Sequence, residues 1–117
     1  MREIKTHKVN GVNDGVKIVA ADAPGSGNAH HHYQVTFSTR VNDIRFQNGP
    51  IKEAGVNGLT HEVLLAIVAD RLECFQSGPF ACDENQEALG HVKAAMAILK
   101  SRTEKRLARG VEGTHQP

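Results

Sequence analysis

Residues 64–103 read LLAIVADRLECFQSGPFACDENQEALGHVKAAMAILKSRT and contain two apolar repeats on either side of a Gly-Pro pair. The first repeat stops at Gly78-Pro79, a pair that ends helices. Its members recur at helical spacing and are Leu64, Ile67, Val68, Arg71, Leu72 and Phe75. In the second repeat the same spacing is kept by Leu89, Val92, Met96, Leu99 and Thr103. Such spacing places the side chains on one face of a helix. The stretch therefore predicts two amphipathic helices joined by a short turn, an antiparallel helical hairpin.

Capping residues set the expected ends of this hairpin, which covers residues 59–110. Thr60 precedes the first repeat and is a good N-cap. Asp83 is the expected N-cap of the second helix, with Gln86 three residues later as its capping-box partner. Gly110 follows the basic end of the second repeat, and glycine is typical of a helix terminator.

The first half of the chain alternates apolar and polar residues instead. Residues 33–37 (YQVTF) show this alternation, and shorter ones surround Val16 and Ile44. A period of two is typical of half-buried strands, and Gly, Pro, Asn and Asp residues between the segments form turns. Residues 1–58 therefore predict an antiparallel sheet of three to five short strands, and the chain is expected to have an α+β fold.

The length of 117 residues predicts a single domain, made of the sheet part (1–58), the hairpin (59–110) and a C-terminal tail (111–117). With four Phe, one Tyr and no Trp, the core of one chain is modest. A two-helix hairpin cannot cover both of its faces by itself, so the sheet is expected on one side and a second copy of the hairpin on the other. We therefore expect a homo-oligomer, at least a homodimer, with helices at its centre.

The charge of the chain argues against a polyanionic partner. Its 14 Lys and Arg nearly balance 13 Asp and Glu, which leaves a net charge of +1. This balance supplies no field for holding DNA or RNA, although a small anion needs only a few local donors. No stretch approaches the roughly 18 apolar residues of a membrane span, and the start lacks a signal-peptide pattern. We expect no nucleic-acid partner, no membrane partner and a cytoplasmic location.

The reactive side chains form no recognisable catalytic set. The histidine run at residues 30–32 invites a metal-site interpretation, but neighbouring strand residues point to opposite faces and no other ligand lies at a suitable spacing. Ser26 lies in a Gly-Ser-Gly run at residues 25–27, which lacks the fuller Gly-x-Ser-x-Gly elbow of hydrolases. Cys74 and Cys82 are expected to be reduced, inert thiols. We expect no metal, no cofactor and no enzymatic activity.

Residues 75–85, FQSGPFACDEN, combine ligand-binding groups around a tight turn. Phe75 and Phe80 precede Asp83 and Asn85 at the start of the second helix, where backbone N–H groups favour an anion such as a phosphate. Aromatic faces suit adenine, and carboxylate or amide groups suit ribose hydroxyls or a base edge. The alternative is that the two rings only fill the end of the hairpin core and that Asp83 only caps a helix.

A basic run ends the second helix. Arg102, Arg106 and Arg109 recur at helical spacing, with Thr103 beside them. Guanidinium groups bind phosphates in bidentate fashion, so these side chains would line a second anion site if an oligomer brought them together. The alternative is that the charges complement the negative end of the helix dipole and stay solvated.

Three separated stretches carry a resemblance to a known family: FQNGPIKEAGVNG at 46–58, LLAIVADRLECFQSGPFAC at 64–82 and RTEKRLARGVEGTH at 102–115. In this order they closely resemble phage Thoeris anti-defence proteins of the first type, whose helical hairpin is related to that of the anti-CBASS sponges. The resemblance covers nearly the whole chain. It implies an oligomer that binds and sequesters glycocyclic ADP-ribose, the messenger of the Thoeris sensor, without degrading it, in the cytoplasm of an infected bacterial host.

The resemblance also implies which residues hold the messenger. Phe75 corresponds to the family's stacking aromatic residue and Asn85 to its polar contact. Arg109 and the strand donors Arg45 and Asn48 are expected to meet the phosphates or the ribose.

A separate nucleotide site is implied as well, because some family members hold cyclic di- or trinucleotides in hexameric assemblies. The contacts for these ligands fall here on Arg102 and Thr103, and the helical spacing adds Arg106. Two departures from the family pattern are visible: Asp83 stands where relatives often carry Arg, and residues 90–103 lack the Leu-Glu-Glu-Ala run and the Trp that relatives often place there.

Two rival hypotheses remain open at this point. One is a hydrolase of the messenger, which would need a nucleophile or a metal cluster that the sequence does not offer. The other is a structural helical-hairpin protein, in which the phenylalanines and arginines only hold subunits together.

Overall fold

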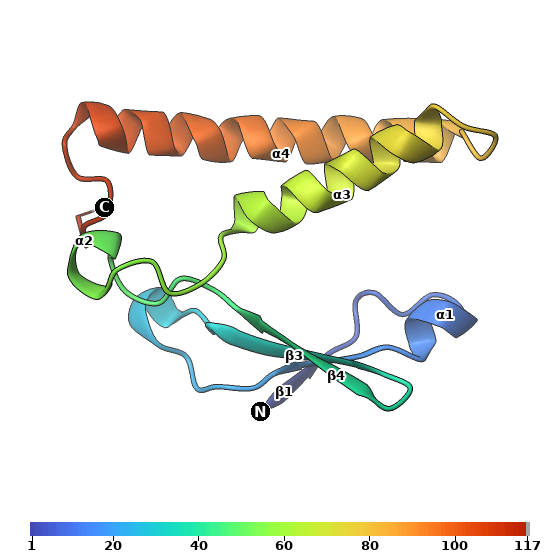
Figure 1. Ribbon diagram of the computed structural model, residues 1–117, viewed down its shortest axis with the longest axis horizontal. Helices are drawn as coiled ribbons and strands as arrows, with labels where there is room; N and C mark the ends of the chain where they lie inside the picture. Colours follow the sequence, from blue (N-terminus) through green and yellow to red (C-terminus); the bar gives the residue numbers. More distant parts are fainter. Residues whose placement is uncertain (117) are drawn as a thin grey trace. The chain divides into compact units, whose positions relative to one another are not determined.

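The computed structural model describes residues 1–116, apart from the side chain of Ser26, and forms two compact units, Met1–Leu59 and Thr60–Pro117. The proposed inertness of Ser26 and the last residue of the expected tail thus lie outside the described residues. The first unit holds an antiparallel sheet and the second a helical hairpin (Figure 1). This arrangement confirms the α+β prediction of a sheet followed by a hairpin.

Four strands make up the sheet of the first unit, in the order β1-β2-β3-β4 and all antiparallel. They are β1 (Arg2–Ile4), β2 (Lys17–Ala20), β3 (His32–Phe37) and β4 (Arg40–Arg45). The unit also contains the short helices α1 (Gly11–Asp14) and α2 (Ile51–Ala54) and the 3-10 turn η1 (Ser26–Asn28). The predicted range of three to five short strands is confirmed.

The register of the strands gathers the alternating apolar residues on one face. Ile18 pairs with Val35 and Ala20 with Tyr33, and residues paired across antiparallel strands point to the same side of a sheet. Ala20 is completely buried. Strand β1 was not predicted, because its three residues include one apolar side chain and so show no alternation.

The second unit consists of α3 (His61–Gln76) and α4 (Asp83–Ala108), with 16 and 26 residues. At 1.5 Å per residue these helices are about 24 and 39 Å long. Helix α4 therefore continues past the beginning of α3, as Figure 1 shows. Both predicted helices are confirmed, and within residues 1–116 no helix has the length and apolar composition that a membrane span requires.

The N-cap of α3 agrees with the prediction, and the N-cap of α4 differs from it. The hydroxyl of Thr60 accepts a hydrogen bond from the N–H of Val63 at 3.4 Å, as expected of the N-cap. The cap predicted for α4 is wrong by one residue: Cys82 is the N-cap, and its sulfur accepts a hydrogen bond from the N–H of Asn85 at 3.4 Å. Asp83 lies in the first turn, where its negative charge still complements the helix dipole.

Helix α4 ends at the glycine that the sequence predicted. Gly110 has φ of 73°, a left-handed conformation that glycine adopts without steric cost. The N–H groups of Gly110 and Val111 donate to the carbonyls of Leu107 and Arg106, each at 3.0 Å. This pair of bonds is the Schellman motif, and it turns the chain sharply away from the helix axis.

Few side chains of the hairpin are buried. Helix α3 buries Ala69, and α4 buries Leu89 and Arg106. Ile67, which the periodicity placed on an apolar face of α3, is 61% exposed, and Ile98 on α4 is 70% exposed. The large side chains of Leu64, Leu72 and Phe75 are only half-buried, so much of the apolar surface predicted for the hairpin is uncovered.

Candidate functional site

A small hollow lies at the turn of the hairpin. We call it the turn hollow; it has a volume of about 280 Å³ and is lined by Arg71, Cys74, Phe75, Gly78, Pro79 and Phe80. The rings of Phe75 and Phe80 lie 6.4 Å apart between centroids at an interplanar angle of 52°. Phe75 is half-buried, whereas Phe80 is 72% exposed. Two aromatic faces at a solvent-accessible hollow form a stacking surface for a planar group.

Arg71 completes the turn hollow from α3. Its guanidinium carbon lies 5.0 Å from the centroid of the Phe75 ring, which is cation–π geometry. The sequence placed Arg71 only in the helical repeat and gave no indication of a ligand contact. The signal that would have identified it is its position four residues before Phe75, since residues at this spacing are neighbours on a helix surface.

The turn itself is held by the side chain of Gln76. Its amide nitrogen donates to the carbonyl of Cys82 at 3.0 Å, and its amide oxygen accepts from the N–H of Cys82 at 3.0 Å. The same nitrogen also donates to the side-chain oxygen of Gln86 at 3.3 Å, so the predicted capping-box role of Gln86 is replaced by a contact between the helices. Gln76 thereby fixes the loop that carries Phe80.

Asn85, the predicted polar contact, lies in the first turn of α4 and is half-buried. It precedes Leu89 by four residues and Val92 by seven, so it lies on the α4 face that carries the hairpin core. The structure thus brings Phe75 and Asn85 to the same end of the hairpin. The residues that line the turn hollow directly are those of α3 and the loop.

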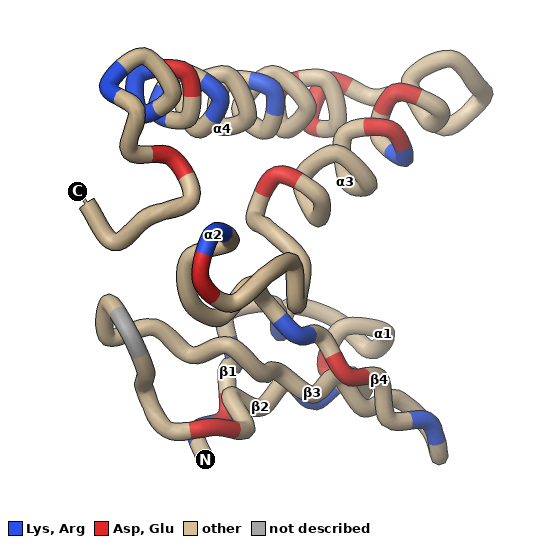
Figure 2. Tube along the Cα trace, turned by 60° about the vertical axis from the view of Figure 1, so that its left-hand side comes forward, with Lys and Arg blue, Asp and Glu red and all other residues tan. Residues whose placement is uncertain are grey.

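A second, larger depression runs along the last turns of α4. This basic groove has a volume of about 630 Å³ and is lined by Ala97, Ile98, Ser101, Arg102, Lys105, Arg106 and Arg109. Figure 2 shows Lys and Arg residues along this part of α4. The groove combines several cations with the exposed side chain of Ile98, an arrangement suited to an anionic ligand that also has an apolar part.

Thr103 lies in a different depression from Arg102. It shares a hollow of about 360 Å³ with Glu62, Met96, Ala97 and Lys100. Consecutive helical residues point about 100° apart, which explains why the predicted pair is divided between two surfaces of α4. Within one chain, Arg102 therefore lies with Arg109, as their helical spacing indicated, although the family resemblance assigned these two arginines to different ligands.

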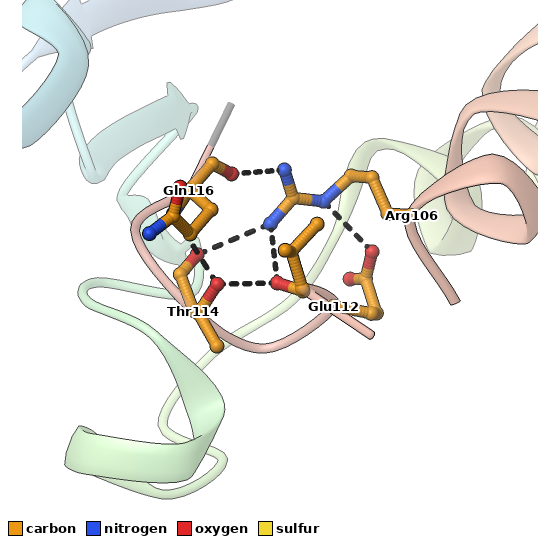
Figure 3. Close-up of polar contacts among 5 residues, drawn as sticks. Arg106, Glu112, Thr114 and Gln116 are labelled. Atoms are coloured by element: carbon orange, nitrogen blue, oxygen red, sulfur yellow. Dashed lines mark hydrogen bonds and ion pairs between the residues drawn. The ribbon is translucent and has the colours of Figure 1, made fainter. Parts of the chain in front are cut away.

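Arg106 is 7% exposed, and its guanidinium donates hydrogen bonds to the C-terminal segment, residues 111–116 (Figure 3). Its Nε donates to the carboxylate of Glu112 at 3.0 Å. One terminal nitrogen donates to the carbonyls of Val111 at 2.9 Å and Thr114 at 3.1 Å, and the other donates to the carbonyl of Gln116. These bonds satisfy a buried charge, which is costly when unpaired. They give Arg106 a structural role, and its predicted ligand contact stays a prediction.

The predicted partnership of Phe75 with Arg109 does not form within one chain. Phe75 lies at the turn, next to the start of α4, whereas Arg109 is the C-cap at the other end of that helix. The 24 residues from Asn85 to Arg109 correspond to about 36 Å of helix, further than one small nucleotide reaches. A shared site would require Arg109 from another copy of the chain.

Arg45 and Asn48 lie in the first unit, at the end of β4 and in the loop that follows. Asn57 fixes this loop, because its side chain accepts from the N–H of Asn48 at 2.8 Å and donates to the carbonyl of Asn48 at 2.7 Å. The carbonyl of Arg45 accepts from the N–H of Leu59 at 2.9 Å. Both side chains are exposed, Arg45 at the last position of β4 and Asn48 on the loop whose backbone Asn57 fixes.

The histidine run is used for hydrogen bonds within the sheet unit. Asp22 accepts from the N–H groups of His31 at 2.9 Å and His32 at 3.3 Å, and the first of these bonds is the main cause of the lowered pKa of Asp22. The ring of His32 donates to Asp43 at 2.7 Å, which lowers the pKa of that carboxyl. Across residues 1–116 no three His, Cys, Asp or Glu side chains are grouped as metal ligands.

A short antiparallel sheet followed by two helices of unequal length defines a small sheet-and-hairpin class of protein. Within that class, the chain belongs to the Acb2/Tad1 hairpin-domain family, whose model matches residues 38–104. This match confirms the family resemblance drawn from the three sequence stretches. The matched residues include Phe75, Asn85, Arg102 and Thr103.

Among characterised proteins, the chain is similar to "Thoeris anti-defense 1" of Bacillus phage SBSphiJ7, with 42% identity over 80 residues. The aligned region covers 68% of this chain and 56% of that relative, so the match spans little more than half of the relative's length.

Proposed function

We propose that this protein is a phage anti-defence protein that binds glycocyclic ADP-ribose and withholds it from the Thoeris system of the host. The observation that carries the proposal is the turn hollow, where two phenylalanine rings and a guanidinium meet at a solvent-accessible surface. The name of the phage relative supplies the biological setting. The action takes place in the cytoplasm of the infected bacterial cell, where the messenger is made.

The chemistry of the turn hollow fits an adenine nucleotide. The ring of Phe75 offers a stacking face for adenine, and Asn85 at the same end of the hairpin offers an amide for the ribose or the base edge. The turn is held by Gln76, so this surface exists before the ligand arrives, and a preformed site loses less entropy on binding. A sponge needs such a site, because it competes with an effector for scarce messenger.

The basic groove supports a second ligand, a cyclic di- or trinucleotide, at a separate site. Arg102, Lys105 and Arg109 line it together and provide cations for several phosphates, which the turn hollow does not. Thr103 lies on an adjacent face, and a larger cyclic ligand would reach it around the helix.

An oligomer completes this proposal, a homodimer or a hexamer. The side chains of Ile67, Ile98 and Leu107 are 61, 70 and 61% accessible, and they lie on different sides of the hairpin as apolar groups that other copies of the chain would cover. A partner chain would also allow Arg109 to approach the turn hollow, which one chain alone does not permit. Arg45 and Asn48 are proposed to meet the phosphates or the ribose from the fixed loop of the sheet unit.

The proposed action is capture without conversion, with no cofactor. Among the described residues, those that line the turn hollow with Cys74 include no carboxylate or histidine that would activate its thiol, which supports capture over hydrolysis. The competing functions are a hydrolase of the messenger, which would release cleaved product, and a purely structural hairpin protein, which would retain no ligand.

The experiment is to incubate the purified chain with glycocyclic ADP-ribose, remove unbound ligand, denature the protein and identify what is released by mass spectrometry. Intact messenger in near-stoichiometric amount is the expected result. Cleaved product would establish the hydrolase instead, and the absence of retained ligand would favour the structural protein. The same experiment with Phe75→Ala, which lacks the stacking ring, should release much less messenger. Phe37→Ala, a change to a partly exposed phenylalanine of the sheet unit, is its matched control.

A further inference from the structure

Arg71 is the only Lys or Arg between residues 53 and 92. The same part of the chain carries the carboxylates of Glu53, Glu62, Asp70, Glu73, Asp83, Glu84 and Glu87. One of them, Glu73, is paired with Lys93 at 2.6 Å, a lysine that lies on the next helix. Among the described residues, Arg71 is therefore the cation at the turn end of one hairpin that is not already paired with a carboxylate, and it lies among acidic groups.

The geometry places this cation beside the stacking surface. The guanidinium carbon of Arg71 lies 5.0 Å from the centroid of Phe75, and Arg71 lines the turn hollow with both phenylalanines. A guanidinium that stacks by its flat face keeps the N–H groups at its edge available for a phosphate. In the described part of the chain, the side chain of Arg71 makes the ring contact but no ion pair or hydrogen bond. Its charge is thus held in place by an aromatic ring and not neutralised by a carboxylate.

We infer that Arg71 is a specificity-determining residue of the turn hollow: it binds a phosphate of the nucleotide whose base stacks on the phenylalanines. The inference rests on the proposed function. It assigns the hollow to ligands that carry a planar base and a phosphate within reach of each other, and it excludes uncharged nucleosides as tight ligands. The acidic groups of the turn, Asp83 and Glu84, strengthen this requirement, because they repel a phosphate that Arg71 does not hold.

The test compares three variants of the full chain by titration calorimetry with glycocyclic ADP-ribose at two salt concentrations. Arg71→Gln removes the charge, Arg71→Lys keeps the charge but lacks the planar fork, and Lys93→Gln is a control for removing a cation from the same hairpin. Arg71→Gln should weaken binding about 30-fold, as expected for a lost charge-assisted hydrogen bond, and Arg71→Lys should weaken it less. The salt dependence of binding should be flatter in Arg71→Gln than in the wild-type chain. Lys93→Gln should leave the affinity within about twofold, because an exposed ion pair contributes little.

If the wild-type chain binds the messenger and Arg71→Gln binds it with the same affinity, the inference about Arg71 is overturned and the proposed function stands. Equal losses in Arg71→Gln and Arg71→Lys, with an unchanged salt dependence, would also overturn it, because they would indicate lost packing and no phosphate contact. A wild-type chain that retains no messenger would overturn the proposed function, and the inference with it. Thermal melting of each variant shows whether the hairpin stays folded. If Arg71→Gln does not fold, the affinity and the salt dependence of Arg71→Lys still test whether Arg71 binds a phosphate.

Discussion

The two ends of α4 differ in what they offer a ligand. At the turn end, two aromatic rings surround a small hollow with one cation, and Gln76 fixes the loop. At the other end, several cations line a groove more than twice as large, and Arg106 fixes the chain that follows the helix. In the proposed function, one helical hairpin thus separates recognition of a base from recognition of several phosphates. A polar side chain fixes the chain beside each surface, Gln76 at the turn and Arg106 at the far end.

The largest expected effect is at the turn end. Phe75→Ala removes the stacking ring and should weaken binding of glycocyclic ADP-ribose about 100-fold, near the upper limit for loss of one base–aromatic stack. Titration calorimetry measures this loss, and size-exclusion chromatography should show an unchanged assembly. If Phe75→Ala binds as tightly as Phe37→Ala and the wild-type chain, the turn hollow is not the site.

The basic groove should respond to a different change. Arg102→Glu reverses one charge in the groove and should weaken binding of a cyclic trinucleotide about 30-fold, because a bidentate phosphate contact becomes a repulsion. Binding of glycocyclic ADP-ribose should remain within about twofold, since Arg102 lies several helical turns away from the turn hollow. Lys17→Glu, with the same charge change in the sheet unit, controls for the altered net charge. Equal losses for both ligands would show that the two surfaces form one site.

A smaller effect, on stability, tests the clamp at the far end of α4. Arg106→Met removes the hydrogen bonds to the C-terminal segment and should lower the free energy of unfolding by about 1.5 kcal/mol. The loss is no larger than this because the carbonyls that Arg106 releases form hydrogen bonds with water instead. Limited trypsin digestion should then cut after Arg109 more readily, and cyclic trinucleotide affinity should fall by less than in Arg102→Glu. An affinity loss in Arg106→Met as large as in Arg102→Glu, with the segment still protected, would instead make Arg106 a direct ligand contact.

The smallest expected effect is a change of stability in the sheet unit, which lies outside both ends of the hairpin. The pKa values of Asp43 and Asp22 are lowered by hydrogen bonds in the folded chain, so each carboxylate stabilises the fold above the ordinary carboxyl pKa near 4. This contribution is lost as the pH falls through the lower folded-state pKa, because the unfolded chain takes up the protons first.

Asp43→Asn should therefore lower the melting temperature slightly at pH 6 and reduce its further fall between pH 6 and pH 3. Circular dichroism melts at the two pH values measure this difference, with Asp70→Asn on α3 as the control. A variant that is as acid-sensitive as the wild-type chain would show that the contact between His32 and Asp43 contributes nothing measurable.

The hairpin was largely predictable because its signals are local. Helical spacing, the hydroxyl of Thr60 and the glycine at position 110 act within a few residues of the chain, and the structure confirms all three. The choice of Cys82 over Asp83 as N-cap was missed, because both residues can cap and the turn before them decides which one has the extended backbone.

The candidate site was predictable only in part. The aromatic residues around the turn were selected from the sequence, but Arg71 was not, because its contact with Phe75 was hidden in a repeat that also explains it as an ordinary helical position. The division of Arg102 and Thr103 between two surfaces follows from helix geometry and was overlooked. The contacts of Arg106 could not be predicted, since they depend on how the chain turns after Gly110 and returns to the helix.

The length of α4 affects how this protein can change through evolution. Asn85 and Arg109 lie about 36 Å apart along α4, well beyond the range over which substitutions within one chain interact energetically. If the two ends bind separate ligands as proposed, a phage can alter the residues at one end to follow a changing bacterial messenger while the other end keeps its own specificity. Within one chain the effects of changes at the two ends should therefore add, whereas substitutions of Arg109 should couple to the turn hollow once a partner chain brings this arginine there.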